Sequence, residues 1–180
     1  MIGSSALRRI MLFTGPRRIR LGLGSLEALG SEARRFDPKR ALVITDPNVK
    51  RLGYLDRVLN ELDYLNVDVY DVRGEPSLAD LEPLVERVRS ESFDLIVGLG
   101  GGSVLDSAKI AAMSARNEGS IESYIGADKV RRKGLPLICI PTTSGTGSEV
   151  TRFAVIRFEW TKRSISSELI IRMPRSSIHY

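Results

Sequence analysis

The chain has 180 residues with a formal net charge of +5, and 42% of its residues are hydrophobic. This length suits one domain, since a chain of this size removes about 70% of its unfolded surface from water. A single cysteine excludes an intrachain disulfide, and a single histidine excludes a histidine-rich metal site built from this chain. The basic charge alone would permit nucleic-acid binding, but zinc-finger spacing and RNP-like aromatic motifs are lacking, so no nucleic-acid partner is expected.

The first 15 residues contain Arg8 and Arg9 but no long apolar run. We therefore expect neither a signal peptide nor a membrane-spanning segment, and we expect the protein to be cytoplasmic.

Apolar periodicity predicts an alternation of strands and helices along the chain. In chain order, we expect strands at 10–13 and 18–21, a helix at 25–36, a strand at 41–45, a helix at 54–62, a strand at 67–72, a helix at 78–90 and a strand at 95–99. Ser25 is the expected N-cap of the first helix. Such alternation indicates a parallel sheet with helices on both faces.

The strand at 95–99 runs into Gly100, Gly101, Gly102 and Ser103, and a helix with apolar residues at helical spacing follows. Glycines let backbone N–H groups approach an anion closely, and the helix dipole favours negative charge at the same point. This pattern predicts a phosphate-binding turn.

A second loop, PTTSGTGSEVT at 141–151, follows the apolar strand expected at 137–140. It carries several hydroxyl side chains that can hydrogen-bond phosphate or sugar oxygens without adding charge. Beyond it, residues 152–157 and 164–171 are expected to form a strand pair joined by the polar segment 159–163.

These two loops resemble the signature loops of the iron-containing (group III) alcohol dehydrogenases. In that family GGGSxxDxAK binds the pyrophosphate of NAD or NADP, and PTTxGTGSEVT borders the nicotinamide; both stand here unaltered. The resemblance extends to RIRLGLGSLEALG and TDPNV before the glycine turn and, more loosely, to KRSISS after the second loop. It implies a doubly wound, Rossmann-like α/β parallel sheet, with residues 1–180 as a single dinucleotide-binding domain. The implied cofactor contacts in the two loops are Gly101, Gly102, Ser103, Thr142, Thr143 and Thr146.

Three further residues are cofactor contacts by the same resemblance. Asp46 of the TD motif would accept from the adenosine ribose, although an aspartate before Pro47 is also an ordinary turn cap. Asp106 would lie near the nicotinamide, and otherwise serves the helix dipole and pairs with Lys109 three residues on. Lys162 matches a family lysine near the cofactor, but the segment before it departs from the family pattern.

In the family, a C-terminal helical half binds the metal through one aspartate and three histidines. This chain has only His179, expected to be an exposed terminal residue, so the resemblance implies iron or zinc only together with that C-terminal half. We therefore expect the nucleotide-binding part of an alcohol dehydrogenase, not competent alone, with a non-catalytic dinucleotide-binding or assembly module as the alternative. The alcohol, and the choice between NAD and NADP, stay open.

Without that half, we expect exposed apolar surface near the second loop and along residues 165–173. The terminal strands, including 10–13, would then offer unpaired edges. These features predict a homodimer.

Overall fold

In the computed structural model, which describes residues 15–171 and 175–179, the main sheet has six parallel strands in the order β1-β9-β6-β4-β2-β3. Its central strands are almost continuously apolar and buried, as expected when helices cover both faces of a parallel sheet. The expected doubly wound, Rossmann-like α/β fold is confirmed. The strands of this sheet are β1 (Arg18–Leu21), β2 (Arg40–Thr45), β3 (Asn66–Asp71), β4 (Leu95–Gly100), β6 (Leu137–Pro141) and β9 (Arg175–His179).

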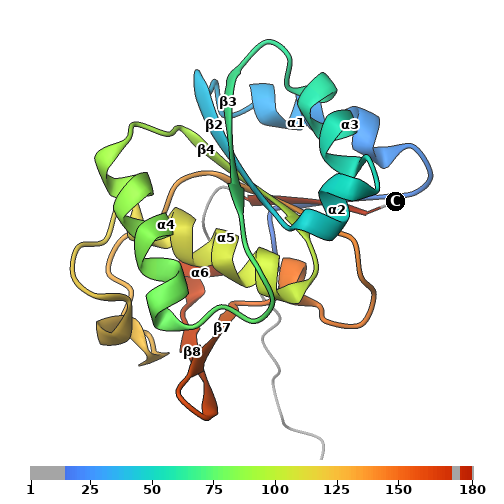
Figure 1. Cartoon of the computed structure of the whole chain (residues 1–180). Helices are drawn as coiled ribbons and strands as arrows, with labels where there is room; N and C mark the ends of the chain where they lie inside the picture. The colour runs from blue at the N-terminus through green and yellow to red at the C-terminus, as the bar shows by residue number, and fades with distance from the viewer. Residues whose placement is uncertain (1–14, 172–174, 180) are drawn as a thin grey trace, which may run out of the picture.

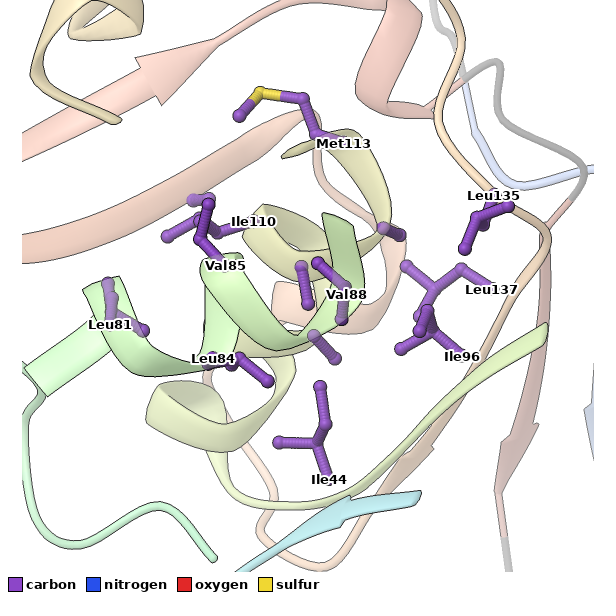
Figure 2. Close-up of a cluster of buried hydrophobic side chains, with 14 of the residues drawn as sticks. Ile44, Leu81, Leu84, Val85, Val88, Ile96, Ile110, Met113, Leu135 and Leu137 are labelled. Atoms are coloured by element: carbon purple, nitrogen blue, oxygen red, sulfur yellow. The ribbon is translucent and has the colours of Figure 1, made fainter. Parts of the chain in front are cut away.

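Helices pack on the two faces of this sheet (Figure 1). One face carries α1 (Leu29–Arg34), α2 (Pro47–Arg51) and α3 (Tyr54–Glu61), and the other carries α4 (Leu78–Ser90) and α5 (Gly102–Ser114). Each layer of helices buries its own apolar cluster against the sheet. Figure 2 shows the second cluster, where side chains of α4 face those of α5 and of the strands; it includes Leu81, Leu84, Val85, Val88, Ile110, Met113, Ile44, Ile96 and Leu137.

The order of the strands reverses between β2 and β4. From β2 the chain passes outward to the edge strand β3, and it then returns across the other face through α4 to β4, on the opposite side of β2. The carboxyl ends of β2 and β4 therefore diverge into loops on opposite faces. Ligands of doubly wound sheets bind in the crevice that such a reversal creates.

A smaller sheet, in the order β5-β8-β7, packs beside α5. Its strands are β5 (Gly126–Ala127), β7 (Phe153–Phe158) and β8 (Thr161–Ser166), and α6 (Glu168–Ile171) follows β8. The strand pair expected here exists, but its second strand was placed too late. Arg157 pairs with Lys162 across a short turn, so residues expected to be a connection form the first half of β8.

The expected first helix is also divided. A 3-10 helix, η2 (Ser25–Ala28), precedes α1, and Gly24 in the left-handed region is its N-cap. Ser25 is therefore not a cap; its hydroxyl donates to the carbonyl of His179. Two further 3-10 helices are η3 (Ile121–Tyr124) and η4 (Ser148–Val150).

Strand β9 was not expected, because three of its residues are polar and buried: Arg175, Ser176 and Ser177. Each of these side chains donates to a distant group. Ser176 Oγ donates to the buried carboxylate of Glu32 at 3.1 Å, and Arg175 donates to the carbonyls of Ser148 and Thr151 at 2.9 and 3.1 Å. The expectation that His179 is a frayed terminal residue is wrong, since it is half-buried in β9.

Within the expected apolar tail, Ile165 and Ile170 are not exposed, since both are buried in the cluster that contains side chains of α4 and α5. Residues 172 and 173 of that tail lie outside the described residues. The strand expected at 10–13 lies outside the described residues. None of the helices in the described part of the chain has the length and apolar character that crossing a bilayer requires.

Candidate dinucleotide cleft

The two glycine-containing loops meet at the carboxyl ends of β4 and β6. The N–H of Thr142 donates to the carbonyl of Gly100 at 3.1 Å, which joins the loops directly. A Cβ at Gly101 would lie 3.3 Å from Thr143 Oγ1, and one at Gly102 would lie 3.2 Å from Thr146 Cγ2. Larger residues would crowd these threonines, so the glycines allow the hydroxyl loop to close on the helix start.

The N-terminus of α5 points into this junction. Gly101 is its N-cap, in an extended conformation and without a side chain to cap the helix. The first bond within the helix is donated by Leu105 to the carbonyl of Gly101 at 3.0 Å. The N–H groups of the first turn therefore have no acceptor inside the helix, and with the helix dipole they form a site suited to phosphate.

Two adjoining cavities flank this helix start. One, of about 780 Å³, extends toward Asp46 at the end of β2. The other, of about 540 Å³, extends toward Phe153 and Val155 on β7. Gly102, Ser103 and Glu75 line both, so the cavities form one continuous cleft across the end of α5. The cleft lies where the strand order reverses, which is the place where doubly wound folds bind ligands.

Asp46 lies at the far end of the first cavity. Its Oδ1 accepts from the N–H groups of Asn48 and Val49 at 2.8 and 3.2 Å, which makes it the N-cap of α2, with Pro47 at the first helical position. The turn-cap interpretation is therefore confirmed. Since one oxygen performs the capping, the other is left for a ligand in the same cavity.

Asp106 is buried at the wall of the second cavity. It lies beyond the first turn of α5, so the interpretation that it serves the dipole at the helix start is wrong. Its Oδ1 accepts from Ser148 Oγ at 2.6 Å, and its Oδ2 accepts from the N–H of Val155 at 3.0 Å. The pairing with Lys109 is confirmed at 2.7 Å. This carboxylate thus ties α5 to the second loop and to β7.

Lys109 has no exposed side-chain surface and also donates to the carbonyl of Phe153. Burial lowers the pKa of its ammonium group, and the charge of Asp106 opposes that shift. Through these two bonds, Lys109 links Asp106 of α5 to Phe153 of β7 beside the second cavity.

Lys162 reaches the second cavity from β8, where it pairs with Glu75 at 2.5 Å. The side chains of this pair are 63% and 53% exposed, so the bond is open to solvent and to exchange with a ligand. Arg157 joins the same wall, because its N–H donates to the carbonyl of Pro76 at 3.2 Å. The loop after β3 is thereby attached to the hairpin formed by β7 and β8.

All nine expected contact residues line one of the two cavities. Asp46, Thr142 and Thr143 line the first together with Gly101; Asp106, Thr146 and Lys162 line the second; Gly102 and Ser103 line both. Glu75 also lines both cavities and was not expected as a contact. The segment GEPS follows β3, the strand beside β2, and loops after parallel strands gather at one edge of the sheet. The place of Glu75 near the cleft could therefore have been inferred.

Metal ligands are a separate question. Within residues 15–171 and 175–179, no group of three or more histidine, cysteine, aspartate or glutamate side chains is arranged to hold a metal ion.

Comparison with known families places the cleft in context. The family model for iron-containing alcohol dehydrogenase matches residues 16–178. The chain is 43% identical over 157 residues to long-chain-alcohol dehydrogenase 1 of Geobacillus thermodenitrificans, covering 84% of this chain and 40% of that protein. The crystal structure of NADH-dependent butanol dehydrogenase A from Thermotoga maritima superposes with a TM-score of 0.85 at 30% identity, covering 95% of this chain and 44% of that one.

Sulfoacetaldehyde reductase from Bifidobacterium kashiwanohense, solved in complex with NAD+, gives a TM-score of 0.85 at 27% identity, covering 95% of this chain and 46% of that one. The chain therefore spans less than half the length of these relatives.

Proposed function

This chain belongs to the iron-containing alcohol dehydrogenase family, and from that premise we propose that it binds a nicotinamide dinucleotide in the cleft at the N-terminus of α5. The observation that carries the proposal is the continuity of the two cavities through Gly102 and Ser103 at the strand reversal. A dinucleotide has an anionic pyrophosphate centre between two nucleoside ends, and the cleft has the matching order. The phosphate-suited helix start lies between two cavities large enough for the two halves of such a ligand.

In this proposal the pyrophosphate lies against Gly101, Gly102 and Ser103, with hydroxyls from Thr142 and Thr143 beside it. The adenosine half occupies the cavity that ends at Asp46, whose second carboxylate oxygen accepts from a ribose hydroxyl. This arrangement favours NAD. Arg73 lines the same cavity and would meet the additional phosphate of NADP, so the choice of cofactor is left to the binding experiment.

The nicotinamide half then occupies the cavity lined by Thr146, Asp106 and Lys162. The apolar side chains of Phe153 and Val155 form one wall, which keeps water away from a transferring hydride. Lys162 would exchange its exposed pairing with Glu75 for the anionic cofactor. Asp106 acts by positioning this wall, because both of its oxygens are bonded to protein groups.

The proposed reaction is hydride transfer between an alcohol and the nicotinamide. A bound iron or zinc ion would polarise the alcohol oxygen and lower its pKa. The described residues hold no group suited to that ion, so we propose that turnover needs metal-ligating residues of the family's C-terminal half. The same observation supports the second candidate, a dinucleotide-binding module without its own catalysis. Alcohol-dependent reduction of the cofactor by the pure chain separates the two.

We further propose that the chain forms a homodimer in the cytoplasm. Strand β1 is an edge of the main sheet, and its Ile19 and Leu21 side chains are 54% and 81% exposed. Such an edge can pair with a second copy. The buried, free thiol of Cys139 is compatible with a reducing compartment.

The binding proposal can be tested with the two halves of the cofactor. In a two-dimensional NMR titration, ADP should shift the backbone amide signals around the Asp46 cavity, and nicotinamide mononucleotide those around the Val155 cavity. NAD+ should shift both sets and bind more tightly than either half. Signals of α1, none of whose residues lines either cavity, are the internal control. If NAD+ at millimolar concentration leaves both sets unmoved, the proposal is wrong.

A further inference from the structure

A third cavity, of about 670 Å³, lies beyond the C-terminal end of α5. It shares none of its lining residues with the dinucleotide cleft, which lies at the other end of the helix. The 13 residues of α5 separate the two places by roughly 20 Å at the usual helical rise. The cavity is therefore a distinct feature that the proposed function does not use.

Four cationic side chains line this cavity: Arg116, Lys129, Arg131 and Arg132. Some cations elsewhere in the described structure pair with acids, as Arg40 does with Asp68 and Glu91. None of the four lining cations forms an ion pair with another described residue. Two acids, Glu118 and Asp128, also line the cavity, which leaves an excess of positive charge.

Buried polar side chains fix the walls that carry these cations. Asn117 is 4% exposed. Its Oδ1 accepts from the N–H groups of Arg131 and Arg132 at 3.1 and 2.9 Å. Its Nδ2 donates to the carbonyl of Met113 at 2.8 Å. One amide thus connects the end of α5 to the backbone of both arginines. The charge cluster is held on an ordered backbone, while its side chains remain free to bind.

The opposite wall is fixed in the same way. Arg89 of α4 donates to the carbonyls of Ser114, Asn117 and Gly119 at 3.1, 2.7 and 2.8 Å. The first of these carbonyls ends α5 and the other two belong to the loop that follows it, so Arg89 holds this loop against the helix end. Tyr124 packs beneath this loop and donates to the carbonyl of Glu118.

We propose that this cavity binds a small, multiply charged anion that bears phosphate groups. Guanidinium groups are well suited to bidentate hydrogen bonds with phosphate oxygens, and two adjacent arginines can neutralise two negative charges. A cavity of about 670 Å³ is in the range occupied by small ligands. The cations are gathered in one hollow, which suits a compact anion better than an extended polymer.

The probe for this site is inorganic tripolyphosphate, added to the full chain and followed by calorimetry at low salt. The helix start at Gly101 is a second place where this anion could bind. All measurements are therefore made in a Gly101→Asp background, which puts a carboxylate there. Binding of one tripolyphosphate per chain is expected. Replacing Arg131 and Arg132 together by alanine should weaken it at least about tenfold, since two charge-assisted contacts are lost.

The control variant removes the same charge elsewhere. Arg57 and Arg163 are exposed and do not line this cavity, so their double alanine variant should bind within about twofold of the background. Truncating the Arg131 and Arg132 side chains leaves their backbone bonds to Asn117 intact, and circular dichroism checks that both variants fold. Equal losses in the two variants, or no loss in either, would overturn the proposal. So would tighter binding of a single-stranded oligonucleotide that depends on the same two arginines, because the ligand would then be a nucleic acid.

Discussion

Gly101→Asp separates the ligand-binding role of the glycine turn from its structural role. Gly101 is the N-cap of α5 with φ −77° and ψ −175°, a conformation open to any residue. Aspartate is among the preferred N-cap residues, and exchanging it with glycine there changes helix stability by only a few tenths of a kcal/mol. The new Cβ would lie 3.3 Å from Thr143 Oγ1, which requires a small shift of an exposed side chain. The variant should therefore keep its thermal midpoint within a few degrees.

The effect on binding should be much larger. The new carboxylate would occupy the free N–H groups that the pyrophosphate needs. At 4 Å and an effective dielectric constant of about 20, two like unit charges repel by about 4 kcal/mol, or roughly a thousandfold in affinity. Gly101 is half-buried, so solvent reduces this value, and we expect a loss of at least about 30-fold.

Calorimetric titration with NAD+ measures this loss, alongside a matched control. Gly15→Asp introduces the same charge at an exposed glycine whose added Cβ meets nothing within 4 Å. The control should bind NAD+ as the parent chain does. Equal affinities of the parent and Gly101→Asp would refute the assignment of this turn to the cofactor, and a large fall in the thermal midpoint would refute the reasoning about the cap.

Three further predictions concern stability, catalysis and assembly. Burial alone would raise the pKa of Glu32, but hydrogen bonds from Arg20 and Ser176 and the charges of Arg20 and Arg18 lower it overall. Its charge therefore adds stability above the ordinary pKa of about 4.5, lost as the pH falls through the lowered value. Glu32→Gln should cost roughly 1–3 kcal/mol in urea unfolding at pH 7. The cost should shrink as the pH falls below about 4.5, and a cost independent of pH would contradict this. Pure chain with added Fe²⁺ or Zn²⁺ should form no NADH from an alcohol above a no-protein control, and a clear metal-dependent rate would overturn the need for further ligands. Light scattering should give about twice the 19.9 kDa chain mass. The double variant Ile19→Asp with Leu21→Asp should be a monomer, whereas Trp160→Asp at the exposed hairpin tip should remain a dimer. A monomeric parent chain would contradict the dimer.

The two loops were predictable from sequence because their signals are local. A glycine run between an apolar strand and an apolar helix specifies a turn and a helix start without any distant contact. The buried runs of β2, β4 and β6 likewise specify a covered parallel sheet. From these elements, the residues at the strand ends could be expected to share one edge of the sheet.

Only the tertiary structure decided which of those side chains bond to other protein groups and which remain available to a ligand. The polar segment at 175–179 forms an interior strand, in which Ser176 donates to Glu32 and Arg175 donates to carbonyls of the second loop. Asp106 is committed to Ser148 and Val155, whereas the exposed pairing of Lys162 with Glu75 can be exchanged; these contacts join residues 42 to 87 positions apart. A periodic pattern carries no information about such partners. Sequence thus determined which turns could bind an anion, and packing determined which side chains remain free to do so, because each hydrogen-bonding atom taken up by the protein is withdrawn from the ligand.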